Sequence, residues 1–156
     1  MRDVNQTFAI DPGASGGFAW HDAEGAKAIA MPKTEGDIRD QILRLAAEGY
    51  RTCYIERVGG FIGTPQPGGA MFKFGRGYGF LLGVMAAYSV RVELVQAHTW
   101  QQTMGIGTKG KLTTGQWKNR LKAKAQQLYP GIQVTLATAD ALLILEYATG
   151  RINNFS

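Results

Sequence analysis

The sequence contains almost no cysteine and no long apolar run. Cys53 is the only cysteine among 156 residues, so no disulfide can form within the chain. Its place in the apolar run 53–55 indicates a buried, inert thiol rather than a nucleophile. No segment is long and apolar enough to span a membrane, so no membrane partner is expected. The start of the chain lacks the apolar core of a secretion signal, and we therefore expect a cytoplasmic protein.

The chain also lacks a linker, an internal repeat and the length for two lobes. With 156 residues it is long enough to bury a core, and we expect one domain over residues 1–156. Most enzymes that close two lobes around a substrate are excluded by this length. The hydrophobic share of 45% suits a compact α/β domain rather than a fibrous or disordered chain.

Acidic residues are scarce in the last two thirds of the sequence. Nine of the twelve lie at or before Glu56, together with six basic residues, so this part carries a net charge of −3. From Arg57 onward there are eleven basic and three acidic residues, a net charge of +8. Such a surface would bind a polyanion, and nucleic acid is the commonest polyanion in a cytoplasm. The alternative is a solvated basic surface with no dedicated partner.

The hydrophobic pattern of the first third predicts three strands, a helix and a fourth strand. The strands are expected at 7–10, 18–20 and around 28–31, with a Pro/Gly-rich turn after Asp11. Thr34 opens a segment of capping-box form, and apolar residues at helical spacing follow until Gly49. The fourth strand, 52–55, is expected to carry Glu56 at its carboxyl end.

The remainder predicts a helix, a strand and two further helices. After a Gly/Pro-rich loop at 59–69, a helix is expected at about 71–88, followed by a strand at 92–95 and a loop. A basic amphipathic helix should cover 117–129, and a last helix should run from near Thr138 toward Gly150. Small residues recur every four positions in the helix 71–88, which would let a second helix approach closely, in this subunit or in a partner.

This order of elements predicts an α/β fold with a mixed five-stranded sheet flanked by helices on both faces. A first meander of three strands, followed by right-handed crossovers, gives that architecture. The strands that end at Asp11 and Glu56 are then neighbours, and both carboxylates stand at one edge of the sheet. Asp140, at the start of the last helix, can face them.

Three clustered carboxylates repel one another and persist mainly where divalent cations neutralise them. Mg²⁺ prefers hard oxygen ligands, and two such ions can stabilise the attacking and leaving oxygens of a displacement at phosphorus. Each acid has an ordinary alternative. Asp11 could belong to a plain turn, Glu56 could pair with Arg57 or Arg76, and Asp140 could serve only the N-terminus of its helix.

Several short segments resemble the RuvC-like Holliday-junction resolvases, particularly the compact members from bacteriophages. They span nearly the whole chain, and their order is more specific than any single motif. The segments are Phe8-Ala9-Ile10-Asp11-Pro12-Gly13 with Ser15-Gly16, Tyr54-Ile55-Glu56, Lys73-Phe74-Gly75-Arg76-Gly77-Tyr78-Gly79, Trp100-Gln101, and Ala139-Asp140-Ala141-Leu142-Leu143.

The resemblance implies a ribonuclease-H-like fold and an endodeoxyribonuclease that acts in DNA recombination and repair. It further implies a homodimer with two active sites, Mg²⁺ or Mn²⁺ as cofactor, and paired nicks across a four-way junction. Asp11, Glu56 and Asp140 match the acidic positions of these enzymes and are the expected catalytic and metal-binding residues. If a bacteriophage encodes the chain, the host cytoplasm is the expected location.

The sequence departs from the pattern of these enzymes at one ligand position. They usually supply a fourth acidic or histidine ligand a few residues before the last aspartate, where this chain has Leu136, Ala137 and Thr138. Glu146 lies six residues after Asp140, about 240° around a helix, and should face elsewhere. A water molecule, Thr138 or Thr135 could complete the site, or the site could be weakened.

Cationic and aromatic residues near the acids are candidates for DNA binding. The expected cationic contacts to phosphates are Lys73, Arg76, Lys109, Lys111, Lys118 and Lys122. Some of these side chains could serve solubility alone, and Arg76 could be a structural ion-pair partner. Phe61, just after Glu56, is the candidate for stacking on a base at the junction centre, or else it packs on the core. His98 could act as a general base but is expected to cap a short turn.

Two other functions remain open from the sequence. A non-enzymatic junction-binding protein would keep the fold and basic surface without the full metal chemistry, as the missing fourth ligand suggests. An actin-like sugar kinase or ATPase is the other, because Asp11-Pro12-Gly13-Ala14-Ser15-Gly16 resembles its first phosphate loop. The length of the chain argues against the second, since it cannot build a cleft between two lobes.

Overall fold

A mixed five-stranded sheet forms the centre of the computed structural model, which describes residues 6–59 and 67–150. The strands are β1 (Thr7–Asp11), β2 (Gly17–Asp22), β3 (Gly25–Ala30), β4 (Thr52–Glu56) and β5 (Arg91–Val95), in the spatial order β3-β2-β1-β4-β5. The pairs β1/β2 and β2/β3 are antiparallel, whereas β1/β4 and β4/β5 are parallel. The predicted order of a meander followed by crossovers is therefore confirmed.

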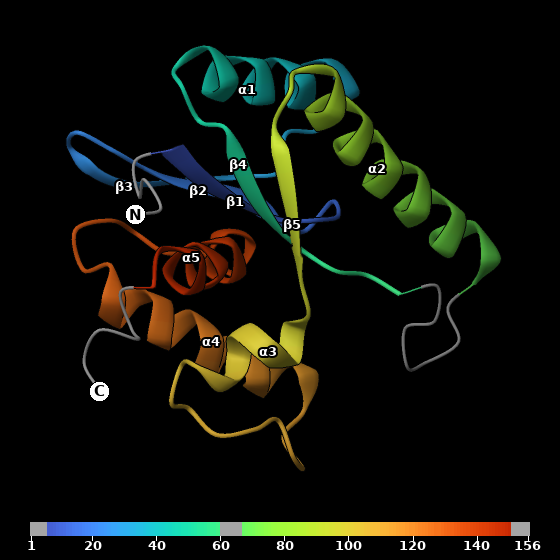
Figure 1. Ribbon diagram of the computed structural model, residues 1–156. Helices are drawn as coiled ribbons and strands as arrows, with labels where there is room; N and C mark the ends of the chain where they lie inside the picture. The colour runs from blue at the N-terminus through green and yellow to red at the C-terminus, as the bar shows by residue number, and fades with distance from the viewer. Residues whose placement is uncertain (1–5, 60–66, 151–156) are drawn as a thin grey trace.

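Helices cover both faces of this sheet (Figure 1). On one face lie α1 (Glu35–Ala47) and α2 (Gly68–Ala87), and on the other lie α3 (Ala97–Gln102), α4 (Thr114–Leu128) and α5 (Leu136–Thr149). Side chains alternate along each strand, so Phe8 and Ile10 of β1 join the core beneath α1 and α2, while Ala9 joins the core beneath α5. The small side chains of Ala9 and Ala19 leave room for α5 to pack directly on β1 and β2.

The structure adds one helix to the predicted elements and starts another earlier than expected. The segment after β5, expected to be a loop, forms the short helix α3. It was missed because six residues are too few to display a helical repeat of apolar positions. Helix α5 begins at Leu136, two residues before the expected Thr138, because Thr135 and Thr138 form a capping box there. No helix in the described part of the chain is long and apolar enough to cross a membrane.

Cys53 is fully buried in β4, as expected for an inert thiol. Burial raises the pKa of this thiol well above its ordinary value, which disfavours the reactive thiolate.

Candidate active site

Two carboxylates leave the sheet side by side because their strands are parallel neighbours. Ile10 of β1 pairs with Ile55 of β4, so the next residues, Asp11 and Glu56, come at the same edge. Both side chains are half-buried. The arrangement predicted for Asp11 and Glu56 follows directly from this register.

The third carboxylate reaches this edge because α5 approaches the sheet unusually closely. A Cβ atom on Gly17 would lie 2.5 Å from the carbonyl oxygen of Ile29 and 2.7 Å from that of Ala137. Only glycine fits between these two backbones. The first turn of α5 is thereby held against the start of β2, and Asp140, one turn further along α5, is placed beside the end of β1.

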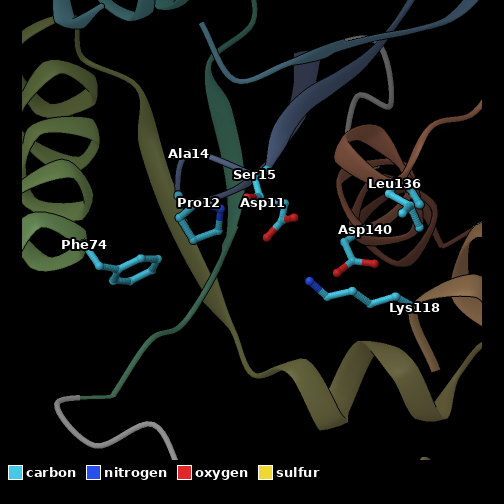
Figure 2. Close-up of a pocket in the computed structure, with 11 residues that line it drawn as sticks. Asp11, Pro12, Ala14, Ser15, Phe74, Lys118, Leu136 and Asp140 are labelled. Atoms are coloured by element: carbon cyan, nitrogen blue, oxygen red, sulfur yellow. The ribbon is translucent and has the colours of Figure 1, made fainter. Parts of the chain in front are cut away.

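Asp11 and Asp140 line a pocket of about 260 Å³. Figure 2 shows their carboxylates directed toward one another, with the ammonium group of Lys118 from α4 next to them. The turn after β1, including Ser15, forms one wall, and Phe74 of α2 lines the pocket next to Pro12, on the side away from Asp140. The remaining lining residues are Pro12, Gly13, Ala14, Gly16, Leu136 and Ala139.

The electrostatics of this pocket disfavour three negative charges without a compensating cation. Burial, followed by repulsion from Asp140 and Glu56, raises the pKa of Asp11 to about 8. Burial also raises the pKa of Asp140 to about 6, and it raises that of Glu56, with repulsion from Asp140 adding to the rise. Since Asp140 raises the pKa of both Asp11 and Glu56, and Glu56 also raises that of Asp11, the three carboxylates form one electrostatic cluster.

Lys118 is the cation that the structure places in this cluster. Its charge lowers the pKa of Asp11 and of Asp140 and so opposes the larger effect of burial. The sequence predicted a phosphate contact at Lys118. The structure places its side chain against the acids themselves, which a residue in a basic helix does not reveal from sequence.

The oxygen ligands of the cluster suit a hard divalent cation, but the described side chains do not yet surround one position. In the described ranges 6–59 and 67–150, no group of three or more His, Cys, Asp or Glu side chains is arranged to hold a metal ion. Carboxylate oxygens are nonetheless the ligands that Mg²⁺ and Mn²⁺ prefer. The unfavourable burial of like charges at Asp11, Glu56 and Asp140 is what such a cation would relieve.

Leu136 occupies part of the space where a fourth ligand was expected. It lines the pocket one helical turn before Asp140, with 54% of its surface exposed. Thr135 and Thr138 use their hydroxyl groups elsewhere, since the two contact each other at 3.2 Å and Thr138 accepts from the backbone N–H of Thr135. Glu146 is buried away from the pocket and accepts a 2.6 Å hydrogen bond from Tyr129, so it faces elsewhere as predicted.

The other predicted cations do not line the pocket. Lys73, Lys109 and Lys111 are exposed, and Lys122 is half-buried on α4. Arg76 forms an ion pair with Glu35 of α1, with 3.1 Å between nitrogen and oxygen, and both side chains are more than half exposed. Arg76 is therefore an ion-pair partner in the structure, as the sequence allowed. Its partner is Glu35 and not Glu56. Phe61 lies outside the described residues.

Sequence reasoning assigned no role to Trp100, Phe74 or Leu136, which all lie at this site. The indole Nε1 of Trp100 donates a 3.1 Å hydrogen bond to Oε2 of Glu56. His98, which was considered as a base, lies on the exposed side of α3, where its Nε2 is 3.0 Å from Nε2 of Gln102. The only sequence signal for Trp100 and Phe74 was their place in matched segments, and for Leu136 its place where a fourth ligand was expected.

No protein-family model and no curated protein sequence matches the chain. The fold itself is of the ribonuclease-H-like class, with the mixed five-stranded sheet and helices that this class requires.

Within that class the structure is similar to RuvC from T. thermophilus. One match is T. thermophilus RuvC in complex with a Holliday-junction substrate, with a TM-score of 0.64, 15% identity and 93% of each chain covered. A second T. thermophilus RuvC structure matches with a TM-score of 0.55 and 15% identity, covering 95% of this chain and 96% of the other. The expected RuvC-like fold is thus confirmed.

Proposed function

We propose that the protein is a structure-selective endodeoxyribonuclease that cuts four-way junctions and other branched DNA by metal-dependent hydrolysis. The observation that carries the proposal is that Asp11, Glu56 and Asp140, from β1, β4 and α5, lie close enough to interact: burial raises the pKa of all three, and Asp140 adds repulsion at both Asp11 and Glu56. The RuvC-like fold, seen elsewhere in a complex with a Holliday junction, supports a branched DNA substrate.

In this proposal Asp11, Glu56 and Asp140 hold Mg²⁺ or Mn²⁺. When bound, a pair of such ions supplies an activated water molecule and stabilises the charge on the leaving oxygen. The chain itself contributes the walls of the pocket, which include the turn after β1 and Phe74 and would orient a phosphate beside Asp11 and Asp140. Lys118 offers its ammonium group to the phosphate oxygens, since it already lies next to two of the acids.

Binding of the DNA arms is assigned to the positively charged part of the chain. Lys73, Lys109, Lys111 and Lys122 are candidates for contacts to phosphates, together with Arg76 if it exchanges Glu35 for DNA. Phe61 remains the candidate for stacking on an unpaired base at the crossing. Paired nicks require two active sites, so we also propose a homodimer.

The exposed face of α2 is our proposed dimer interface. A Cβ atom added at Gly75, Gly79 or Gly83 would meet nothing within 4 Å, and Phe72 on the same helix is 73% exposed. A second copy of this helix could approach closely along such a face and bury the phenylalanine.

A junction-binding protein with weakened catalysis is the second candidate. The observation in its favour is Leu136, an apolar side chain in the region where these nucleases usually have a further ligand. Such a protein would keep the RuvC-like fold and the basic surface, and it would bind branched DNA without cutting it.

A cleavage assay separates these candidates. With Mg²⁺ or Mn²⁺, the wild-type protein should nick a mobile four-way junction in pairs and leave a linear duplex of the same sequence intact. Asp11→Asn and Glu56→Gln should reduce cutting to about one-hundredth or less, the order of loss when one charge-stabilising group is removed from an active site. Junction binding by both variants should persist, because the fold and basic surface are unchanged.

Glu24→Gln is the matched control, since Glu24 is an exposed acid in the turn between β2 and β3, far from the acidic cluster. Full activity of Asp11→Asn would refute the catalytic role of this cluster. Junction binding by the wild type without any nicking would favour the junction-binding protein instead.

A further inference from the structure

Trp100 is a fully buried side chain with a direct contact to one of the three acids. Its indole Nε1 donates to Oε2 of Glu56 over 3.1 Å. An indole nitrogen has one hydrogen to donate and no capacity to accept. The partner that Trp100 has found for this hydrogen is therefore the carboxylate of the proposed metal site.

The fold brings the two residues together although they are 44 positions apart in the sequence. Val95 at the end of β5 pairs with Glu56 at the end of β4, and the N–H of Arg57 donates to the carbonyl oxygen of Val95 over 2.7 Å. The chain then turns into α3, so Trp100 returns beneath the carboxyl end of the sheet. Thr103 fixes the end of this helix by donating to the carbonyl oxygen of Trp100 over 2.7 Å.

The ring of Trp100 is held by packing on every side. It belongs to the core between the sheet and α5, where Met104, Leu142 and Leu143 are also buried. A side chain locked in this way keeps its N–H in one direction. The carboxylate that accepts from it is held in one orientation in turn.

We propose that Trp100 is a positioning residue that orients the Glu56 carboxylate for a divalent cation. The inference rests on the proposed function of the acidic cluster and adds one residue to it. With Oε2 accepting from the indole N–H, rotation of the carboxylate is restricted, and Glu56 would meet the ion in one orientation. Hydrogen bonds to metal ligands from surrounding residues commonly change metal affinity or activity by about 10–100-fold.

The direction of this hydrogen bond supports the same role, because the indole N–H can only donate and a carboxylate in its ionised, metal-binding form can only accept.

The hydrogen bond can be tested first in the metal-free protein, by NMR of the indole N–H groups. The chain has three tryptophans, Trp20, Trp100 and Trp117, and single replacements by phenylalanine assign the three signals. Glu56→Gln and Glu56→Ala should shift the Trp100 signal and leave the other two in place. An unchanged Trp100 signal in both variants would overturn the proposal, whether or not Trp100→Phe itself folds well.

The positioning role is tested next by calorimetric titration with Mn²⁺. Trp100→Phe keeps a buried aromatic ring but removes the donor, and it should weaken Mn²⁺ binding by about 10–100-fold. Trp117→Phe is the matched control, because Trp117 is buried in the same core and has no hydrogen bond to an acid among residues 6–59 and 67–150. Junction cleavage by Trp100→Phe should show a lower kcat with little change in KM for the DNA.

The outcomes for Trp100 and for the proposed function are distinguishable. If the wild type binds Mn²⁺ and cuts junctions while Trp100→Phe does both equally well, the positioning role is wrong and the nuclease function stands. If the wild type neither binds Mn²⁺ nor cuts, the proposed function is wrong. The role of Trp100 at a metal site is then wrong with it, even where the NMR experiment confirms the hydrogen bond.

Discussion

At the scale of single residues, Asp11 is the most strongly perturbed group of the site. Its carboxylate is buried beside Asp140 and Glu56, with Lys118 as a partial counter-charge. A pKa of about 8 means that much of Asp11 keeps its proton at neutral pH when no cation is bound. Ionised Asp11 is therefore unfavourable in the metal-free protein and would be stabilised by a bound cation. The free energy of unfolding should depend on pH as a result.

We predict that Asp11 makes the metal-free protein less stable as pH rises. The unfolded chain releases this proton near pH 3.8 and the folded chain near pH 8, so the folded state holds the extra proton between these values. The contribution of Asp11 to the free energy of unfolding therefore falls through this window and is lowest above pH 8. Asp11→Asn should then raise the free energy of unfolding at pH 8.5 by a few kcal/mol, since each pKa unit corresponds to about 1.4 kcal/mol.

Urea unfolding with EDTA at pH 4.5 and pH 8.5 measures this effect. The advantage of Asp11→Asn over the wild type should be small at pH 4.5 and large at pH 8.5. Added Mg²⁺ should stabilise the wild type more than the variant, because the ion binds only the folded site. An equal difference between the two proteins at both pH values would show that Asp11 is not buried with its neighbours as described.

At the scale of elements, the site depends on how closely α5 lies against the sheet. Strands β1 and β4 place two acids by register alone, but Asp140 depends on a helix that follows β1 by well over a hundred residues. Gly17 controls that approach, because backbone atoms on both sides leave no space for a Cβ atom. The distance between the acids on the strands and Asp140 on α5 therefore depends on Gly17.

We predict that Gly17→Ala separates Asp140 from Asp11. The added methyl group must push α5 or β3 away, and overpacking of this kind typically costs about 1–3 kcal/mol. Urea unfolding should show this loss, and junction cutting should fall far more than junction binding. Gly115→Ala on α4 is the control: its Cβ atom would meet nothing within 4 Å, so it should be neutral or slightly stabilising. If Gly17→Ala cuts junctions as well as the wild type, Gly17 does not set the position of α5 and Asp140.

At the scale of the whole molecule, the charges are divided along the chain. The first 56 residues carry most of the acids, many in local ion pairs such as Arg44 with Glu48 and Lys27 with Glu24. The later part is basic and includes α4 beside the pocket. DNA is therefore expected to bind over the later elements and to enter the pocket from that side.

Affinity for a four-way junction should depend steeply on salt. If roughly six phosphates are contacted, the affinity should fall by about a thousandfold between 50 and 200 mM salt. Lys109→Ala or Lys111→Ala should each reduce the slope of log affinity against log salt by about 1. Lys33→Ala, from the acidic part of the chain, should leave the slope unchanged. A shallow slope for the wild type would rule out binding through the basic surface.

The proposed dimer gives a prediction of its own. Gly79→Lys places a charge on the exposed face of α2 and should weaken self-association by at least about tenfold, since a buried unpaired charge is costly. Gly77→Lys is the control, because Gly77 lies about 200° around the same helix and is equally open. Sedimentation velocity compares both with the wild type. A wild-type protein that stays monomeric at high concentration would exclude the dimer.

The sequence alone determined the order of strands, the position of two acids at strand ends and the uneven division of charge. These follow from local patterns, because alternation and turn residues define strands, and parallel neighbours end at the same edge. Only the tertiary structure decided that Lys118 lies against the acids, that Trp100 donates to Glu56 and that Leu136 enters the pocket. Each depends on the packing of helices that are remote in sequence, and side-chain direction across such packing has no local signature.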